Sequence, residues 1–562
     1  MSLKVLILGG VATGPKTAAR LRRLDPDAEI TVIERQDVLS YAGCGMPYYI
    51  EDVIKDYNKL LGGSTIRDAD YFKQYKDFTV YTQTEALKIN RGEKTVTVKD
   101  LRTGEVRDLP YDKLVLATGA SPFVPHMSGT DLKGVYRLYN PHNAEEIKST
   151  VNRGCDKVVV VGGGLIGMET CGAFVARGCD TTVIEMMPTL VPNLMDDEMS
   201  LLLENYLKYK GVKVVKGSPV AKILDDGKGN AVGVQTSDGN LVEADLVILA
   251  IGVRPNTKLA LDAGLEIGPT RAIAVNEYLQ TSDPDIYAGG DCVECTNIIS
   301  GEKVFAPLGS TANKHGRIIA DNINGREMKF LGVGGTAVFK VLDWNCGTTG
   351  LTERKSKSLG YDIVTTIVPI RDYSNYIPGS KTIFIKLIAD RKTCKVLGCQ
   401  ILGEGDGIKR IDVIATAIKF ASNVKDIADI DLGYAPAYST AIDAIAHAAN
   451  MLHNKIDGIA HGISSSKMKE KLDGSEDFIL LDVRQKSELK AVRFKDKREI
   501  NIPIDQLKRH ASELPKDKEI ILSCAVGQRA YNGERILRGK GFKKVNYLEG
   551  SIVAWPYPDY LI

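Results

Sequence analysis

Short apolar runs alternate with amphipathic helical patterns over most of the chain. Residues 4–8 form the first apolar run, followed by a glycine turn and a helical pattern that ends near residue 24. Residues 157–161 begin a second unit of the same kind, with a glycine turn and a helical pattern over residues 168–177. Because parallel strands are usually connected by helices, this order predicts an α/β protein with two three-layer nucleotide-binding folds.

The pattern differs in the second half of the chain. Apolar runs at 337–341 and 382–387 precede helical patterns at 409–421 and 439–452, which predicts an α+β domain. A polar, basic segment near residues 455–471 has the composition of a linker. Strands and helices alternate again after it, so we expect a separate small α/β domain at the end of the chain.

The totals describe a large, nearly neutral globular protein. A chain of 562 residues is too long for one core and predicts several domains. The net charge of +2 argues against a nucleic-acid or membrane-surface protein, and no apolar run reaches the ~18 residues of a membrane span. Without a secretory signal after Met1, we expect a cytoplasmic protein. The ten cysteines lack the spacing of a disulfide framework or zinc site, so no metal is expected.

The first glycine turn has the features of a dinucleotide site. Gly9 and Gly14 keep their places in the G-x-G-x-x-G pattern, whereas Val11 occupies the middle glycine position and Ala12 follows it. Such a turn places a pyrophosphate on the free N–H groups of a helix N-terminus. Glu34 ends the next strand about 20 residues later, the usual distance for a carboxylate that accepts ribose hydroxyls.

The second glycine turn keeps the full pattern, with glycines at Gly162, Gly164 and Gly167. Glu185 ends the following strand, and a carboxylate there accepts both ribose hydroxyls of NAD and repels the 2′-phosphate of NADP, which favours NADH. Later apolar strands lead to Gly252 and, after two glycines, to Asp291, a position suited to a ribityl or phosphate contact. Two nucleotide folds, one inserted into the other, predict transfer of a hydride between two nucleotides.

Cys44 lies between two glycines, where backbone approaches a flat ligand closely and no side chain screens the sulfur. A two-cysteine flavoenzyme would carry its second cysteine about five residues later, but that position is Tyr49. Cys44 is therefore expected to react alone or with a thiol outside its own motif. The alternative is a small buried cysteine without a chemical role.

The first helix carries Lys16, Arg20 and Arg23 on one face. A solvated helix face is the simpler interpretation. The alternative is a phosphate-binding stripe beside Cys44, extended by Lys76, for a thiol substrate with an anionic handle.

Together with residues 308–317, these motifs resemble the FAD- and NAD(P)H-dependent pyridine nucleotide:disulfide oxidoreductases. The segment from Ser40 to Tyr49 is similar to their single-cysteine branch, the coenzyme A-disulfide reductases and NADH oxidases. The resemblance implies an FAD-binding domain at 1–115 and 246–328, an NAD(H)-binding domain at 116–245 and a dimerisation domain at 329–455. The residues expected to bind FAD or NADH are Gly9, Val11, Ala12, Gly14, Glu34, Arg35, Ser40, Thr118, Gly119, Asp291, Gly162, Gly164, Gly167, Glu185 and Gly252.

The resemblance also implies a homodimer in which each subunit lends tyrosines to the other's reactive sulfur. Tyr376 and Tyr434 match such positions, whereas Ile377 stands where the family often has another tyrosine. Tyr438 is equally well explained as a turn residue at the dimer seam. The residues expected to bind coenzyme A are Lys16, Arg20, Arg23, Lys76, Asn313 and Tyr438.

A second reactive sulfur is expected at Cys524, which follows a strand and opens the loop before a helix. Backbone N–H groups and the helix dipole at such a place stabilise an anionic sulfur. With residues 482–484 and 550–556, the segment 465–562 resembles a rhodanese domain. The resemblance implies a persulfide on Cys524, a loop closed by the Arg529 cation, and a fold braced by Asp482 and Arg484. The alternative is a buried structural cysteine.

These features predict an FAD-dependent NADH oxidoreductase. NADH reduces FAD, Cys44 attacks the sulfur–sulfur bond of a persulfide, polysulfide or coenzyme A-linked sulfur species, and Cys524 relays sulfane sulfur. Coenzyme A is expected as a tightly held carrier. The thiolate is the nucleophile, so the pKa of Cys44 is expected to be lowered. Coenzyme A-disulfide reduction and NADH oxidation are the enzymatic alternatives, and a redox sensor is the non-enzymatic one.

Overall fold

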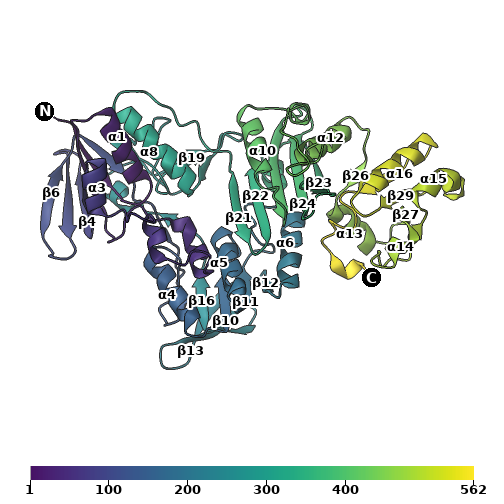
Figure 1. Cartoon of the computed structure of the whole chain (residues 1–562), viewed down its shortest axis with the longest axis horizontal. Coiled ribbons are helices and arrows are strands. Elements are labelled where there is room, and N and C mark those ends of the chain that lie inside the picture. Colours follow the sequence, from purple (N-terminus) through teal and green to yellow (C-terminus); the bar gives the residue numbers. More distant parts are fainter. Residues whose placement is uncertain (1) are drawn as a thin grey trace. The chain divides into compact units, whose positions relative to one another are not determined.

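The computed structural model describes residues 2–562, which form two compact units (Figure 1). One unit contains residues 2–184 and Ser218–Val333, and the other contains Glu185–Gly217 and Gly334–Ile562. The prediction of an α/β protein with two nucleotide-binding folds, an α+β domain and a final α/β domain is confirmed. No helix among the described residues has the length and apolarity needed to cross a bilayer.

A parallel sheet of five strands carries the first glycine turn. Its strands are, in spatial order, β18 (Ile286–Ala288), β7 (Lys113–Leu116), β1 (Lys4–Leu8), β2 (Glu29–Ile33) and β3 (Thr79–Tyr81). Helices α1 (Thr13–Leu24) and α8 (Gly309–Ile323) pack together and cover one face, where Leu21 and Ile319 join the buried side chains of β1. This sheet therefore combines strands that precede the inserted second nucleotide fold in the sequence with one strand, β18, that follows it.

The other face of this sheet is covered by an antiparallel meander of β4 (Thr84–Asn90), β5 (Thr95–Asp100) and β6 (Val106–Pro110). Ile89, Val96 and Val98 of the meander are buried against Leu6 and Leu114. Both faces of the parallel sheet are therefore buried from solvent, as its continuous apolar strands require.

The second nucleotide fold of this unit has parallel strands β11 (Asp180–Glu185), β10 (Lys157–Val161), β16 (Leu246–Leu249) and β9 (Val135–Tyr136), in that order. A small antiparallel sheet of β13 (Val220–Asp225), β14 (Ala231–Thr236) and β15 (Leu241–Glu243) accompanies it. Helices α4 (Pro141–Asn152) and α5 (Leu165–Ala176) both contact α2 (Met46–Ile50), the short helix after Cys44.

The other unit contains the α+β domain. Its antiparallel sheet has the order β21 (Ala337–Val341), β22 (Trp344–Gly350), β25 (Val396–Gly403), β24 (Thr382–Asp390) and β23 (Ile363–Arg371). Helices α6 (Asp197–Tyr209), α9 (Glu353–Ser358), α10 (Arg410–Lys419), α11 (Val424–Ala428) and α12 (Ala444–Ile456) belong to the same unit.

The last domain is built on the parallel sheet β26 (Gly462–Ile463), β30 (Val545–Leu548), β29 (Glu519–Ser523), β27 (Phe478–Asp482) and β28 (Glu499–Asn501). Helices α13 (Ser465–Asp473), α14 (Lys486–Leu489), α15 (Ile504–His510) and α16 (Gln528–Gly539) connect these strands.

The structure places helices at both ends of the segment 455–471 that was expected as a linker. Helix α12 runs to Ile456 and α13 begins at Ser465, because the side chain of Ser464 accepts the N–H of Lys467 and caps that helix. Serine-rich composition usually indicates a loop, but at this position it marks the start of a helix.

Candidate active site

The first glycine turn has a geometry that only glycine allows at two positions. Gly9 has φ +123°, and a Cβ there would lie 2.0 Å from the carbonyl oxygen of Ala117. A Cβ on Gly14 would lie 1.9 Å from the carbonyl oxygen of Gly9. Val11, at the middle position, is half-buried between them. The turn therefore keeps the two glycines on which its close packing depends and tolerates the departure at Val11.

Glu34 and Asp291 lie at the carboxyl ends of β2 and β18, two strands of the same sheet. Glu34 accepts the N–H of Gly10 at 2.7 Å through Oε2 and the N–H of Gln36 at 2.8 Å through Oε1. Burial raises the pKa of Glu34 and raises that of Asp291 to about 6. The Asp291 carboxylate makes no hydrogen bond with residues 2–562, so its oxygens are available to a hydroxyl-bearing ligand. These two carboxylates and the glycine turn fit the ribose, ribityl and phosphate groups of FAD.

The turn before Asp291 is held by a neutral histidine. His315 of α8 accepts the N–H of Gly290 at 3.0 Å through Nδ1, and Thr13 of α1 donates to the carbonyl of Ala312 at 3.0 Å. Burial lowers the pKa of His315 to about 4, which keeps the ring uncharged near neutral pH. Sequence reasoning did not assign His315, because its ring acts through the backbone fold.

The remaining residues expected at this site differ in their surroundings. Thr118 donates to the carbonyl of Asn256 at 2.7 Å, and Asn256 donates back to the carbonyl of Thr118 at 2.8 Å. Gly119, the residue after Thr118, has φ +65°. Ser40 has φ +45° and accepts a long hydrogen bond of 3.5 Å from Arg67. Arg35 is exposed, with only a 3.7 Å contact to Glu85.

The second glycine turn repeats the geometry of the first. Gly162 has φ +108°, and a Cβ there would lie 2.4 Å from the carbonyl oxygen of Ala250, while one on Gly167 would lie 1.9 Å from that of Gly162. A Cβ on Gly164 would meet nothing within 4 Å, so the space over this turn is open to a ligand. Gly252 also faces open space. Glu185, at the end of β11, is buried and accepts the N–H of Met187 at 2.8 Å.

Cys44 is exposed on the short turn η1 (Gly43–Gly45), directly before α2. Surrounding protein atoms displace part of its solvent, and this effect, followed by the charges of Glu169 and Asp291, raises the pKa of the Cys44 thiol. The expectation that its environment lowers the pKa is therefore not met within this chain. Cys44 is exposed, as expected, but the residues around it favour the protonated thiol over the thiolate.

Glu169 is the residue of this site that sequence reasoning missed. It lies on α5, which contacts α2, and Arg177 at the end of α5 donates to the carbonyl of Ile50 at 3.2 Å. Burial raises the pKa of Glu169 to about 7, and its charge raises the pKa of both Cys44 and Tyr48. Its carboxyl makes no hydrogen bond with residues 2–562. The only sequence signal is an acidic residue two positions after the last glycine of the turn, inside an otherwise apolar helix.

The basic stripe on α1 is partly structural. Arg20 donates to both carboxylate oxygens of buried Asp321 on α8, at 2.7 and 3.3 Å, and so joins the two helices. Arg23 is exposed and Lys16 half-buried. Lys76 lies 5.8 Å from the ring centroid of Tyr71. Asn313, on α8, is also exposed and donates to the carbonyl of Gly309 at 2.8 Å.

The tyrosine-bearing turns of the α+β domain lie side by side. The N–H of Ser374 donates to the carbonyl of Pro436 at 3.2 Å, and a hydrogen bond between Tyr376 and Tyr434 raises the pKa of Tyr434. Tyr376, Tyr434 and Tyr438 expose 67%, 52% and 79% of their surfaces. Large aromatic side chains this exposed are typical of surfaces that bind a partner or ligand.

Cys524 is buried at the end of β29, in a loop that cradles its sulfur. The Sγ accepts the N–H of Gly527 at 3.1 Å, and Ser551 accepts the N–H of Cys524 at 3.1 Å. Gly527 has φ +97° and precedes α16, whose positive helix end faces the loop.

The charged residues near this loop are paired. Arg529 donates to both carboxylate oxygens of Glu488, at 2.8 and 2.7 Å. Asp482 and Arg484 form a fully buried ion pair at 2.7 Å, as expected for braces of the domain. Because its guanidinium pairs with Glu488, the Arg529 cation is partly neutralised within the chain.

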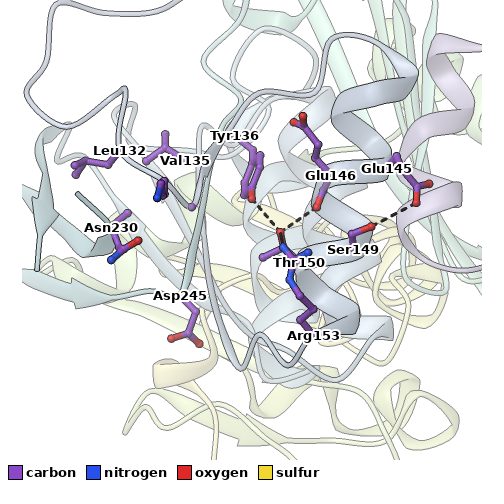
Figure 2. A pocket seen from close by; sticks show the side chains of 13 residues that line it. Leu132, Val135, Tyr136, Glu145, Glu146, Ser149, Thr150, Arg153, Asn230 and Asp245 are labelled. Carbon is purple, nitrogen blue, oxygen red and sulfur yellow. Dashed lines mark hydrogen bonds between the residues drawn. The ribbon is translucent and has the colours of Figure 1, made fainter. Parts of the chain in front are cut away.

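A separate open hollow lies on the second nucleotide fold (Figure 2). Tyr136 and Thr150 share a hydrogen bond of 2.9 Å on its wall, and Arg153 and Asp245 lie at its end. None of the glycine-turn residues or cysteines named above lines it. It is therefore distinct from the dinucleotide turns.

Comparison with known proteins agrees with the geometry. Residues 3–316 match the pyridine nucleotide-disulphide oxidoreductases, 336–446 the dimerisation domain of the same proteins and 464–556 the rhodanese-like domain. An NADH oxidase of Methanocaldococcus jannaschii is 37% identical over 80% of this chain and 98% of its own length. An NAD(P)H coenzyme A polysulfide/persulfide reductase of Pyrococcus horikoshii is 35% identical over 80% of this chain and 99% of its length.

Some solved structures span nearly the whole chain. The NAD-dependent persulfide reductase from A. fulgidus superposes with a TM-score of 0.93 at 41% identity, over 98% of this chain and 100% of that one. Its coverage, unlike that of the two relatives above, includes the final domain.

Two glycine turns, the carboxylates of Glu34 and Asp291 and an exposed cysteine in one unit define a dinucleotide-dependent oxidoreductase of the thiol- and disulfide-reacting class. The chain belongs to the pyridine nucleotide-disulphide oxidoreductases and carries a C-terminal rhodanese-like domain. Membership bears out the expected use of FAD and a pyridine nucleotide.

Proposed function

We propose that this protein is an NADH-dependent reductase of sulfur–sulfur bonds in persulfides, polysulfides or coenzyme A-linked sulfane sulfur. The observation that carries the proposal is the exposed Cys44, which has no cysteine partner in its motif and shares one unit with both glycine turns. A thiol presented in this way suits attack on an external sulfur. The polysulfide/persulfide reductase of P. horikoshii supports the choice of substrate class.

Cys44 and Glu169 have separate roles in breaking the sulfur–sulfur bond, as nucleophile and as proton donor. The Cys44 thiolate attacks the carbon-bound sulfur of a persulfide R–S–SH, forms a Cys44–S–S–R bond and expels hydrosulfide. Glu169, with a pKa of about 7, holds the proton that the leaving sulfur takes up. When bound, FAD supplies the two electrons from NADH that return the mixed disulfide to Cys44 thiolate and R–SH.

We assign the domains as the sequence indicates: FAD to 1–115 and 246–328, NADH to 116–245, dimerisation to 329–455 and sulfur transfer to 465–562. Glu185 selects NADH over NADPH because its carboxylate repels a 2′-phosphate. The phosphates of coenzyme A lie against Lys16, Arg23, Lys76 and Asn313, with Arg20 as a structural neighbour.

The protein works as a homodimer in this proposal. Tyr376 and Tyr434, joined by a hydrogen bond and exposed, approach the Cys44 of the other subunit, and Tyr438 borders the coenzyme A site. Cys524 receives sulfane sulfur from a donor, and its N–H cradle holds the resulting anionic persulfide for transfer toward Cys44.

Anaerobic NADH oxidation with coenzyme A persulfide tests the proposal. Cys44→Ser is expected to lower the rate by about two orders of magnitude or more, because serine is a far weaker nucleophile toward sulfur. Cys394→Ser is the matched control, since Cys394 is a partly exposed free thiol outside the site. A Cys44→Ser variant that oxidises NADH at the wild-type rate would refute the assignment.

Oxygen reduction is the second candidate, and the similarity to the M. jannaschii NADH oxidase favours it. The two functions separate by measuring oxygen uptake with NADH alone. A sulfur reductase consumes oxygen slowly and oxidises NADH several-fold faster once sulfane sulfur is added. Fast oxygen uptake without any sulfur species would favour the oxidase.

A further inference from the structure

Two free cysteines outside the sites above lie in contact in the second nucleotide fold. Cys155 precedes β10, and Cys179 precedes the neighbouring parallel strand β11. The Sγ of Cys179 donates to the carbonyl of Cys155 at 3.3 Å, and the Sγ of Cys155 donates to the carbonyl of Lys157 at 3.9 Å. Each residue keeps 7% of its surface exposed. Cys171 of α5 is buried as well and is a free cysteine.

The backbone places the two cysteines at a spacing that a disulfide can span. The N–H of Asp180 donates to the carbonyl of Asp156 at 2.7 Å, which continues the β10–β11 pairing one step toward the cysteines. In this register Cys179 lies opposite Asp156, so Cys155 is its diagonal neighbour on the adjacent strand. Neighbouring strands lie about 5 Å apart, and a diagonal pair is compatible with the about 4.4–6.8 Å between the Cα atoms that disulfides join.

The two thiols have opposite electrostatic surroundings. The adjacent Cys155 thiol and the Arg177 guanidinium lower the pKa of Cys179, whereas the adjacent Cys179 thiol and burial raise the pKa of Cys155. Cys179 is therefore the more readily ionised of the two sulfurs, which suits it to attack first, with Cys155 as the resolving cysteine.

An open hollow lies close to this end of the sheet. Arg153 and Asp245 line the hollow of Figure 2, and Asp245 accepts the N–H groups of Asp156 and Lys157 at 3.0 and 2.8 Å. The hollow thus reaches the chain segment that carries Cys155.

We propose that Cys155 and Cys179 are a reversible redox site, in which a small hydroperoxide converts the two thiols to a disulfide. The Cys179 thiolate attacks hydrogen peroxide, an S–O bond forms, the O–O bond breaks, and hydroxide leaves. The Cys155 sulfur then attacks the sulfenic acid, the S–O bond breaks, and the Cys155 proton leaves with the oxygen as water. The two cysteines lose two electrons in total and the peroxide gains them.

The disulfide would join the ends of two helices that support the active cysteine. Cys155 follows α4 and Cys179 follows α5, and Arg177 already bridges them by donating to Asn152 at 2.7 Å. Both helices contact α2, directly after Cys44. Oxidation would therefore crosslink the two helices that support the turn carrying Cys44.

The test treats the wild-type holoenzyme with hydrogen peroxide without NADH, blocks free thiols with N-ethylmaleimide and maps non-reduced peptides by mass spectrometry. The expected result is a Cys155–Cys179 linked peptide that dithiothreitol removes, while Cys171 stays unlinked. Oxidation is also expected to raise the thermal unfolding midpoint by several degrees, because the crosslink restricts the unfolded chain. This rise is expected to be absent in Cys155→Ser.

Two variants test the order of attack. In Cys155→Ser, dimedone is expected to trap a sulfenic acid on Cys179, and in Cys179→Ser, Cys155 is expected to stay unmodified. Recovery of both cysteines as alkylated thiols in the wild type, under conditions that oxidise Cys44, would overturn the proposal. So would faster oxidation of Cys155 than of Cys179.

Discussion

At the scale of single residues, the chemistry of Cys44 depends on two carboxyl groups close to its sulfur. Glu169 and Asp291 both raise the pKa of the Cys44 thiol, and burial raises their own pKa values to about 7 and about 6. Because the charges of these carboxylates raise the pKa of Cys44, its thiolate is more favourable when the carboxyl groups hold their protons. A thiolate on Cys44 therefore coincides with a protonated carboxyl that can protonate a leaving sulfur.

Replacing Glu169 with glutamine is expected to lower the pKa of Cys44, because a negative charge that raises it is removed. The measurement is the pH dependence of Cys44 alkylation by iodoacetamide, followed on the Cys44 peptide. Glu146→Gln on α4 is the control and is expected to leave the profile unchanged. Below about pH 7, where wild-type Glu169 holds its proton, NADH-dependent persulfide reduction by Glu169→Gln is expected to fall relative to the wild type, because the proton donor is lost. An unchanged alkylation profile would contradict this account.

At the scale of elements, the α+β domain is held by a buried ion cluster. Lys386 of β24 is 1% exposed and donates to Glu198 of α6 and Glu353 of α9 at 2.8 Å each, with Asp196 at 3.3 Å. The three carboxylates outweigh the cost of burial and raise the pKa of Lys386. One lysine thus joins three segments of this unit.

Lys386→Met is expected to destabilise the unit by about 3–5 kcal/mol, since it leaves carboxylates buried without a cation. The thermal unfolding midpoint reports the change. Lys392→Met, on the exposed turn between β24 and β25, is the control and is expected to stay within about 0.5 kcal/mol of the wild type. Equal stability of the two variants would show that the cluster does not hold these elements together.

The loop between β29 and α16 depends on one glycine. Gly527 has φ +97° and donates its N–H to the Cys524 sulfur. Gly527→Ala is expected to reduce persulfide formation on Cys524 about tenfold or more, because alanine disfavours this backbone conformation. Intact-protein mass after incubation with a sulfane-sulfur donor measures it.

Gly539→Ala is the matched control for that loop variant. Gly539 lies at the other end of α16, where a Cβ meets nothing within 4 Å and φ is not positive. Full persulfide formation in Gly527→Ala would mean that the cradle does not hold the sulfur.

At the scale of the whole molecule, two sulfur sites lie in different units. Cys44 belongs to the unit with both glycine turns, and Cys524 belongs to the other. Relatives such as the M. jannaschii protein match 80% of this chain over nearly their full length, so the flavin-type portion exists elsewhere as a whole protein. The chemistry of Cys44 should therefore be separable from that of Cys524.

Cys524→Ser is expected to retain NADH oxidation within about twofold when coenzyme A persulfide is supplied directly, and to lose NADH oxidation driven by an external sulfane-sulfur donor. Cys44→Ser is expected to lose both. Parallel stopped-flow assays with the two substrates make the comparison. Loss of both activities in Cys524→Ser would show that the two sulfurs act as one obligatory site.

The sequence by itself determined the features that depend on local geometry. The glycines of both turns, the carboxylates Glu34, Asp291 and Glu185, and the sulfur positions Cys44 and Cys524 follow from spacing along strands and helix starts, because a strand–turn–helix unit requires them locally. In the segment 455–471 the composition indicated a linker, whereas the local geometry makes Ser464 a helix cap.

Only the tertiary structure decided which distant side chains meet. Glu169 approaches Cys44 because α5 packs on α2, Arg20 is paired by Asp321 because α1 packs on α8, and Cys155 meets Cys179 because β10 and β11 are neighbours. These contacts join residues far apart in the chain, and the electrostatic environment of each group follows from them. Periodicity and spacing carry no information about such pairs, since they describe one segment at a time.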